Sequence, residues 1–224
     1  MNQAYLYGNP GDGFGYWDDP SAGPGLLART LDLNFGAKAD HYLTVNMQTF
    51  VRIVDALGGL DVTLEHAVGG SDNLNLQAGQ HHLNGAEALA LARDRSRGVF
   101  SRDTNQDLVI CALQRRLSSP GVLPRVPALV QAFSNSVQTD LDSRSIGQLA
   151  CLAGYLPREN ISFFSVPESE FTADRIYDPV FEGSVFVWRV DELIFRNYVA
   201  QFQSGMWPES PDDVDSAGSP VSCQ

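Results

Sequence analysis

The sequence predicts a globular domain of the α/β or α+β class. Two stretches that alternate apolar and polar residues, HYLTVN (41–46) and LDVTLEH (60–66), are predicted strands. Between them, MQTFVRIVDALGG (47–59) repeats its apolar residues at helical spacing and ends on two glycines. A strand, a helix and a strand in succession are typical of a sheet with helices packed against it. The chain has 224 residues, of which 43% are hydrophobic, so it can bury a sizeable core.

The N-terminal part is expected to be a packed loop followed by a short helix. The first two dozen residues are rich in glycine and proline, with aromatic residues between them. From Gly25 onward, leucines recur at helical spacing as far as Gly36, which predicts a helix that ends on that glycine.

The next part combines a polar segment with a well-marked helix start. The segment from 67 to 82 is polar and contains His81 and His82, which we interpret as surface loop residues. Asn84 followed by Glu87 has the spacing of a capping box, so a helix is expected to begin there and to end among arginines.

The remaining elements follow from the same patterns. Further helices are predicted at 103–117, 124–138, 144–156 and 191–202, and further strands at 161–166 and 184–190. The last residues are acidic, without any basic residue, which is typical of a disordered tail. We therefore expect one domain over residues 1–204 and an acidic tail over 205–224. The sequence predicts neither a membrane-spanning segment nor a signal peptide.

Four arginines lie close together in a chain that is acidic overall. The formal net charge is −12 at pH 7, which argues against nonspecific binding to nucleic acids or anionic membranes. The four are Arg93, Arg95, Arg97 and Arg102. Guanidinium groups match the oxygens of phosphates, so we expect a phosphorylated ligand at this cluster. The alternative is a solvated arginine face with local ion pairs to Asp94 and Asp103.

Other chemical motifs find little support. No G-x-S-x-G segment occurs, and the glycines near the N-terminus neither follow a predicted strand nor open a helix. Asp55 lies near a helix C-terminus, where an acid is unfavourable, so we expect it to have a local hydrogen-bonding or structural role and not to act as a base.

The three cysteines lack the spacings of metal or redox sites. Cys111, Cys151 and Cys223 are far apart, and we expect the first two to be buried free thiols. A Cys111–Cys151 disulfide would require an oxidising compartment.

The order of several segments resembles the LytR–CpsA–Psr family of cell-envelope proteins. The resemblance covers residues 1–117 and continues more weakly to about 204. Its most specific blocks are DHYLTVN with the following VDALGGLDV, and LNGAEALALARDR. Further matching segments are NQAYLYG and FSRDTNQDLVICAL.

The resemblance implies a fold and an activity. The expected fold is a mixed α/β domain in which a central sheet and its flanking helices enclose an apolar pocket for a polyprenyl chain. The expected activity is a phosphotransferase of cell wall biogenesis, which moves a glycan polymer from its polyprenyl-pyrophosphate carrier onto peptidoglycan. The partners are then that lipid-linked glycan and the peptidoglycan acceptor, on the extracytoplasmic face of the cell membrane.

The family's functional residues fall on particular positions of this sequence. Its R-x-R pair falls on Arg93 and Arg95, and its next arginine and glutamine fall on Arg102 and Gln106. The three arginines are expected to bind the pyrophosphate and, with Gln106, to act in catalysis by neutralising and orienting the phosphoryl oxygens. Arg97 has no family counterpart.

The apolar stripes of two helices are the candidates for the lipid pocket. We expect it to be lined by some of Phe50, Val54, Leu89, Ile110 and Leu113. Ordinary core packing is the alternative for each of them.

The chain also departs from the family pattern. In the family, a membrane helix and a strand with two magnesium-binding aspartates precede the position of Asn2. The resemblance thus implies Mg²⁺ as a cofactor, and we expect its ligands and the membrane helix to be missing from a truncated chain. Val99 and Asn105 replace an acid and an arginine of the family. Two alternatives therefore remain: a noncatalytic polyprenyl-phosphate binding protein, or an inactive partial gene product.

Overall fold

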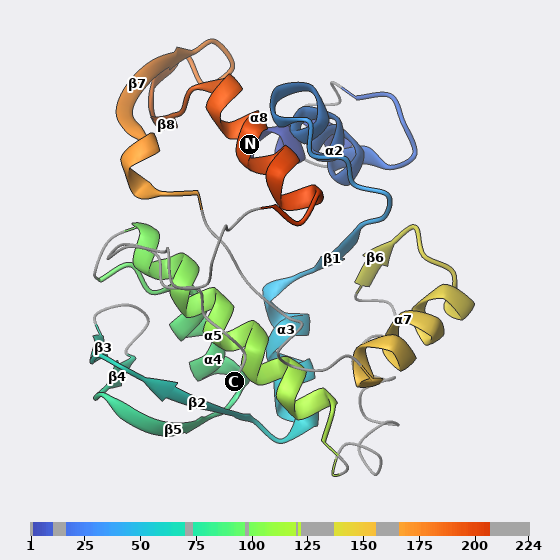
Figure 1. The fold of residues 1–224 in the computed structure, drawn as a ribbon, viewed down its shortest axis with the longest axis vertical. Coiled ribbons are helices and arrows are strands. Elements are labelled where there is room, and N and C mark those ends of the chain that lie inside the picture. Colours follow the sequence, from blue (N-terminus) through green and yellow to red (C-terminus); the bar gives the residue numbers. More distant parts are fainter. Residues whose placement is uncertain are drawn as a thin grey trace. The chain divides into compact units, whose positions relative to one another are not determined.

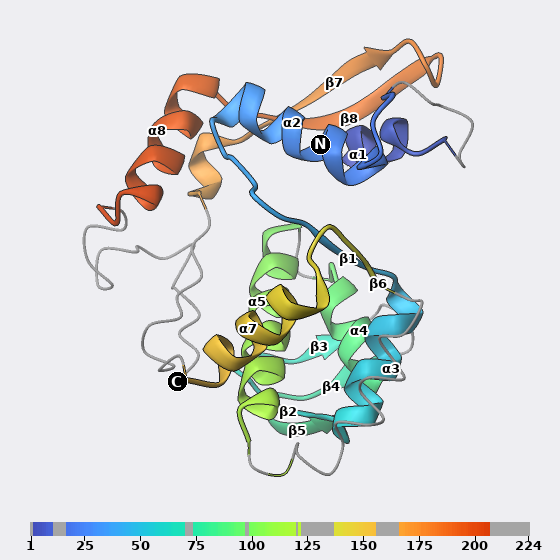
Figure 2. The same ribbon diagram turned by 90° about the vertical axis from the view of Figure 1, so that its right-hand side faces the viewer.

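The computed structural model describes most of the chain in two compact units (Figures 1 and 2). The described residues are 2–10, 17–69, 74–96, 99–119, 121, 137–155 and 166–206. Unit 1 combines Met1–Asp40 with Phe164–Pro220, and unit 2 combines His41–Phe163 with Val221–Gln224. Of the predicted tail, residues 207–224 lie outside the described residues.

The core of unit 2 is an antiparallel strand pair covered by helices. Strand β2 (Leu60–Leu64) pairs with β5 (Gly79–Leu83), so that Leu60 lies opposite Leu83. Burial alternates along β2, as expected for a strand with one face in the core. The covering helices are α3 (Met47–Leu57), α4 (Gly85–Arg93) and α5 (Val99–Leu117). Helix α5 contacts β2, and α4 lies between α3 and α5 in the packing (Figure 2).

The mixed α/β class predicted from the sequence is confirmed. The predicted strands at 41–46 and 60–66 and the helices at 47–59 and 103–117 are present, although α5 begins earlier, at Val99. The strands of the described part form antiparallel pairs, β1 with β6, β2 with β5, β3 with β4 and β7 with β8, and not one continuous central sheet. No described helix has the length and apolarity that crossing a membrane requires.

The polar segment 67–82 contains strands that its composition did not reveal. Strand β3 (Val68–Gly69) pairs with β4 (Asn75–Leu76), and Val68 is buried in the core. His81 and His82 lie in strand β5, so their interpretation as loop residues is wrong. The pattern failed because β5 is held by pairing with β2, and its own residues alternate only weakly between apolar and polar.

Helix α4 begins with the predicted capping box. Asn84 Oδ1 accepts a hydrogen bond from Glu87 N at 3.0 Å, and Glu87 Oε2 accepts one from Asn84 N at 2.9 Å. Two backbone donors at the helix start are thereby satisfied, and the prediction of a helix start at this position is confirmed.

Asp55 joins the two most specific sequence blocks to each other. Gly85 N, at the start of α4, donates a hydrogen bond to Asp55 Oδ1 at 2.7 Å. The helices approach so closely here that a Cβ on Gly85 would lie 2.2 Å from Val51 O. The expected structural role of Asp55 is confirmed, and Gly85 is required by the close approach of two backbones.

Gly85→Ala is expected to destabilise the protein by about 1–3 kcal/mol, because the backbones of α3 and α4 must move apart to admit a methyl group. Urea unfolding followed by circular dichroism measures this loss. Gly147→Ala is the matched control, because nothing lies within 4 Å of a Cβ on Gly147. In that helix interior, alanine should stabilise by up to about 1 kcal/mol. Equal losses in both variants would contradict the steric explanation.

A second strand pair of unit 2 joins distant parts of the sequence. Strand β1 (Leu43–Val45) pairs antiparallel with β6 (Val137–Thr139), and helix α7 (Ser143–Tyr155) follows. The predicted helix 144–156 is confirmed. The predicted helix 124–138 is wrong at its end, where β6 begins, and its residues 124–136 lie outside the described part. Val137 and Thr139 are β-branched and pair with β1, which favours a strand.

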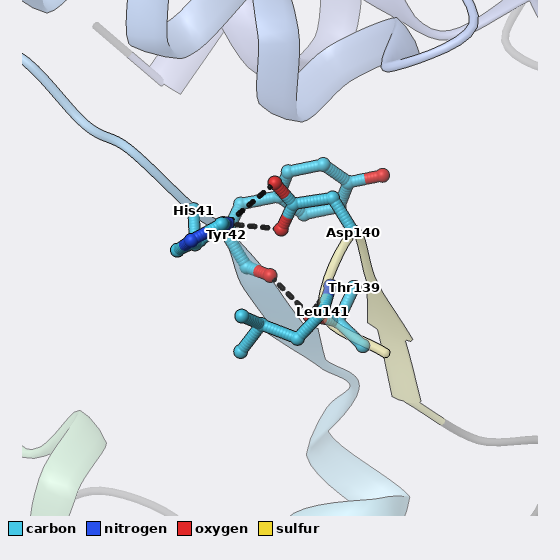
Figure 3. Close-up of polar contacts among 5 residues, drawn as sticks. All are labelled: His41, Tyr42, Thr139, Asp140 and Leu141. Carbon is cyan, nitrogen blue, oxygen red and sulfur yellow. Dashed lines mark hydrogen bonds and ion pairs between the residues drawn. The ribbon is translucent and has the colours of Figure 1, made fainter. Parts of the chain in front are cut away.

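The aspartate after β6 holds the start of β1 (Figure 3). Asp140 Oδ1 accepts a hydrogen bond from Tyr42 N at 2.9 Å, and Asp140 Oδ2 lies 3.0 Å from His41 Nδ1. Thr139 Oγ1 donates to Tyr42 O at 2.6 Å. The bond from Tyr42 N, and then the contact with His41, lower the pKa of Asp140 from its ordinary value of 3.8.

The contacts of Asp140 are expected to make the stability of the fold depend on pH in the acidic range. Because its pKa is lower in the folded state, the charged carboxylate stabilises the fold above pH 3.8, and this contribution is lost as the pH falls through the folded pKa. Asp140→Asn should therefore lower the urea midpoint at pH 7 more than at pH 3. Asp40→Asn, at an exposed position, is the control. If the urea midpoint of Asp140→Asn differs from that of wild type by the same amount at both pH values, the role of Asp140 is refuted.

Unit 1 contains helices and one β-hairpin. The helices are α1 (Asn2–Gly8), α2 (Ala22–Phe35) and α8 (Glu192–Gln203), with a 3-10 turn at Glu168–Glu170. The hairpin consists of β7 (Thr172–Asp178) and β8 (Gly183–Arg189), paired in antiparallel register (Figure 1). Helix α8 and strand β8 confirm the predictions at 191–202 and 184–190. The predicted strand 161–166 lies outside the described residues except for Val166, which is not in a strand.

The expected N-terminal loop is partly helical. Helix α1 occupies Asn2–Gly8, where a loop was expected, and α2 begins at Ala22 and ends, as predicted, on Gly36 in the left-handed conformation (φ 70°). The reason for α1 is tertiary, because it packs against α2 and donates hydrogen bonds to Asp178.

Asp178 organises the turn between β7 and β8. It is only 6% exposed and accepts hydrogen bonds from Val180 N at 2.8 Å, Phe181 N at 3.2 Å, Tyr7 OH at 3.2 Å and Gln3 Nε2. Burial alone would raise the pKa of this carboxyl, but these hydrogen bonds outweigh it and lower the pKa from 3.8. Asp178 therefore acts as a charged structural centre of unit 1.

Candidate functional site

The arginine cluster lies where α4 ends. Arg93 occupies the last turn of α4, and Arg95 follows the C-cap residue Asp94; both arginines are exposed. Asp94 has extended backbone angles (φ −61°, ψ 135°), so the chain leaves the helix there. Cations at this end of a helix are favoured by its dipole. The two arginines thus flank a helix end, with their guanidinium groups accessible to solvent.

Asp94 is a buried carboxylate between the two arginines. It is 1% exposed, and its Oδ2 accepts hydrogen bonds from Ser96 Oγ at 2.7 Å and Ser96 N at 3.3 Å. Its Oδ1 has no hydrogen-bond partner among the described residues. Asp94 therefore fixes the turn that carries Arg95.

Gln106 approaches the same helix end from α5. Its Nε2 donates a hydrogen bond to Ala92 O at 3.1 Å, next to Arg93 in the sequence. The structure therefore places Gln106 beside the end of α4 that carries Arg93 and Arg95. Arg97 and the side chain of Arg102 lie outside the described residues.

The candidate pocket residues differ in their surroundings. Val54 is completely buried in the core of unit 2, while Phe50 and Leu113 are half-buried and pack against that core. Leu89 is half-buried, and Ile110 is 48% exposed. Core packing thus accounts for Val54, and the lipid pocket stays a prediction for the others.

Cys111 is not a free thiol. It is 2% exposed on α5 and is disulfide-bonded, so the expectation of a buried free thiol is wrong for this residue. The sequence holds two other cysteines, Cys151 and Cys223, far from Cys111 along the chain. Spacing did not reveal the bond, because such a bond depends on which segments pack together.

Fold and site together define a mixed α/β domain with two exposed arginines at a helix end. Residues 1–193 match the LytR_cpsA_psr family. The chain belongs to this family.

Curated relatives support the assignment. The chain is 32% identical over 181 residues to the polyisoprenyl-teichoic acid--peptidoglycan teichoic acid transferase TagU of Oceanobacillus iheyensis, covering 79% of this chain and 53% of the relative. It is 28% identical over 149 residues to the regulatory protein MsrR of Staphylococcus aureus, covering 65% and 46%. The chain therefore spans about half the length of these relatives.

Solved structures share the fold. The crystal structure of B. subtilis TagV matches with a TM-score of 0.61 and 24% identity, over 80% of this chain and 69% of that one. The LytR-Csp2A-Psr enzyme from Actinomyces oris matches with a TM-score of 0.53 and 24% identity, over 58% and 56%. At these identities the likeness concerns the fold.

Proposed function

We propose that this protein transfers a glycan polymer from a polyprenyl-pyrophosphate carrier onto peptidoglycan. The observation that carries the proposal is the placement of Arg93, Arg95 and Gln106 at the end of α4, in a chain that belongs to the LytR–CpsA–Psr family. The name of the Oceanobacillus iheyensis relative, a teichoic acid transferase that acts between polyisoprenyl-linked polymer and peptidoglycan, supports the reaction class.

The chemistry needs positive charge at the phosphates. An acceptor hydroxyl oxygen forms a bond to the phosphorus that bears the glycan, the bridging P–O bond breaks, and the polyprenyl phosphate leaves. The hydroxyl proton passes to a base. Arg93 and Arg95, with Arg102 as the third proposed member, neutralise the phosphoryl oxygens during this exchange. The amide of Gln106 orients an oxygen and does not take the proton.

We also propose that part of the apolar set binds the carrier lipid. Phe50, Leu89 and Leu113 are half-buried beside the core of unit 2, so apolar surface is present for an isoprenoid chain to cover. Ile110, at 48% exposure, offers further apolar surface on α5.

Magnesium has no complete set of ligands in the described part. The family resemblance implies Mg²⁺, but the described residues include no group of three or more His, Cys, Asp or Glu side chains that could hold a metal ion. The unpartnered Asp94 Oδ1 is a single oxygen, whereas Mg²⁺ demands near-octahedral coordination. The described residues do not fit the ion, and no step of the proposed reaction runs through it.

The proposed place of action is the extracytoplasmic face of the cell membrane. Peptidoglycan, the proposed acceptor, lies outside that membrane. The disulfide of Cys111 supports this location, because disulfides persist in oxidising compartments outside the cytosol.

A transfer assay tests the function. The purified chain is incubated with a radiolabelled oligosaccharide on polyprenyl pyrophosphate and with purified peptidoglycan. We expect label to become covalently attached to the peptidoglycan, and an Arg93→Ala/Arg95→Ala variant to abolish the attachment. Binding of the lipid-linked substrate without attachment would favour the noncatalytic carrier-binding alternative, and absence of both would overturn the proposal.

A further inference from the structure

Unit 2 has a cavity that the proposed transfer reaction does not use. Its volume is about 580 Å³, within the range of small-molecule sites. It lies between strands β2 and β5 and the C-terminal half of α5, and none of the arginines of the α4 end lines it. The lining residues are Asp61, Val62, Thr63, Gln80, His81, His82, Ala112, Arg115, Arg116 and Ser119.

The lining is cationic in a protein that is strongly acidic. The lining contains two arginines and one aspartate, so its formal net charge is +1 when both histidines are counted as neutral. The formal net charge of the whole chain is −12. The carboxylate is already engaged, because Asp61 Oδ1 lies 2.6 Å from His82 Nδ1. An anion therefore meets less repulsion here than the net charge of the whole chain suggests.

The two arginines are held in place by backbone carbonyls. Arg116 Nε donates to Leu57 O at 2.9 Å, and Arg115 Nη2 donates to Asp61 O at 3.1 Å. A guanidinium carries five N–H donors, so a bond through Nε alone does not saturate that of Arg116. Fixed guanidinium groups lose little freedom on binding a ligand, which favours recognition of a phosphate.

The rest of the lining suits hydroxyl groups better than a lipid. Thr63, Gln80 and Ser119 carry neutral hydrogen-bonding side chains, and the apolar members are only Val62 and Ala112. A cavity of about 580 Å³ also exceeds what a bare phosphate ion fills, so it leaves space for a polyhydroxyl group.

We propose that this cavity binds a phosphorylated sugar or polyol, with the phosphate on Arg115 and Arg116 and the hydroxyls on the polar side chains of β2 and β5. The ligand is either a free sugar phosphate or a repeating unit of an anionic polymer. The site is separate from the arginine pair at the end of α4.

Calorimetric titration of the full chain tests the proposal. The probes are glucose 6-phosphate, glucose, inorganic phosphate and a synthetic oligo(glycerol phosphate). We expect glucose 6-phosphate to bind more tightly than either glucose or inorganic phosphate alone. Tighter binding of the oligomer per phosphate group would identify a polymer as the source, and equal binding would identify a free sugar phosphate.

Variants locate the binding. Arg115→Gln/Arg116→Gln should weaken glucose 6-phosphate binding by about tenfold or more, since charge-assisted hydrogen bonds are lost. Gln80→Glu leaves the hydrogen bonds from both arginines to backbone carbonyls intact. It should weaken binding several-fold, because it adds a negative charge to the cavity. This variant therefore tests the proposal if the double variant does not fold. Arg189→Gln, which removes an ion pair with Asp174 in unit 1, should bind like wild type.

Three results would overturn the proposal. The first is that wild type does not bind glucose 6-phosphate. The second is that both Arg115→Gln/Arg116→Gln and Gln80→Glu bind it with unchanged affinity. The third is that Arg93→Gln/Arg95→Gln loses the binding while Arg115→Gln/Arg116→Gln retains it. The last result would assign the phosphate to the α4 end.

Discussion

Replacing Cys111 by serine is expected to lower the free energy of unfolding by about 2–4 kcal/mol, because the unfolded chain gains freedom when its cross-link is lost. For a chain of this size, the midpoint of thermal unfolding should fall by about 4–16 °C. Differential scanning calorimetry of the oxidised wild type and the variant measures the change. A reducing agent should produce a similar shift in wild type and almost none in the variant.

Two further variants identify the partner of Cys111. The sequence holds only Cys151 and Cys223 besides it, so serine at one of these positions should reproduce the loss and serine at the other should leave stability nearly unchanged. The unaffected variant is thus the matched control. If wild type with and without reductant unfolds at one temperature, the disulfide does not stabilise this protein.

Arg93→Ala and Arg95→Ala should each weaken binding of a polyprenyl phosphate by about 1.5–3 kcal/mol, the range of hydrogen bonds to charged groups. This corresponds to about tenfold to more than a hundredfold in affinity. Calorimetry with a short-chain polyprenyl phosphate in detergent provides the measurement. Lysine at either position should restore affinity only in part, because it keeps the charge and loses the planar fork.

Arg189→Ala is the control for these arginine variants. Arg189 is exposed like Arg93 and Arg95, but its guanidinium pairs with Asp174 at 2.8 Å on the hairpin of unit 1. We expect its affinity to equal that of wild type. Equal affinity in wild type, Arg93→Ala and Arg95→Ala would remove the pyrophosphate assignment and leave the arginines as a solvated face.

The sequence alone determined the elements whose signals are local. The capping box of Asn84 and Glu87, the glycine stop of α2 at Gly36 and the alternation of β2 each depend on residues within a few positions of one another. The same holds for Arg93 and Arg95, which lie two residues apart at the end of α4. These signals predicted the mixed α/β class correctly, and they supplied the candidate arginines, whose role stays a prediction.

Only the tertiary structure decided the features that depend on distant partners. Strand β5 forms because β2 lies beside it, β6 forms because β1 does, and helix α1 forms where its side chains bond to Asp178. The disulfide of Cys111, the requirement for glycine at Gly85 and the cavity beside Arg115 and Arg116 likewise arise where chain segments meet. The physical reason is that strand pairing and close packing depend on which segments lie side by side in the folded protein. The spacing of residues within one segment does not reveal which distant segment it will contact.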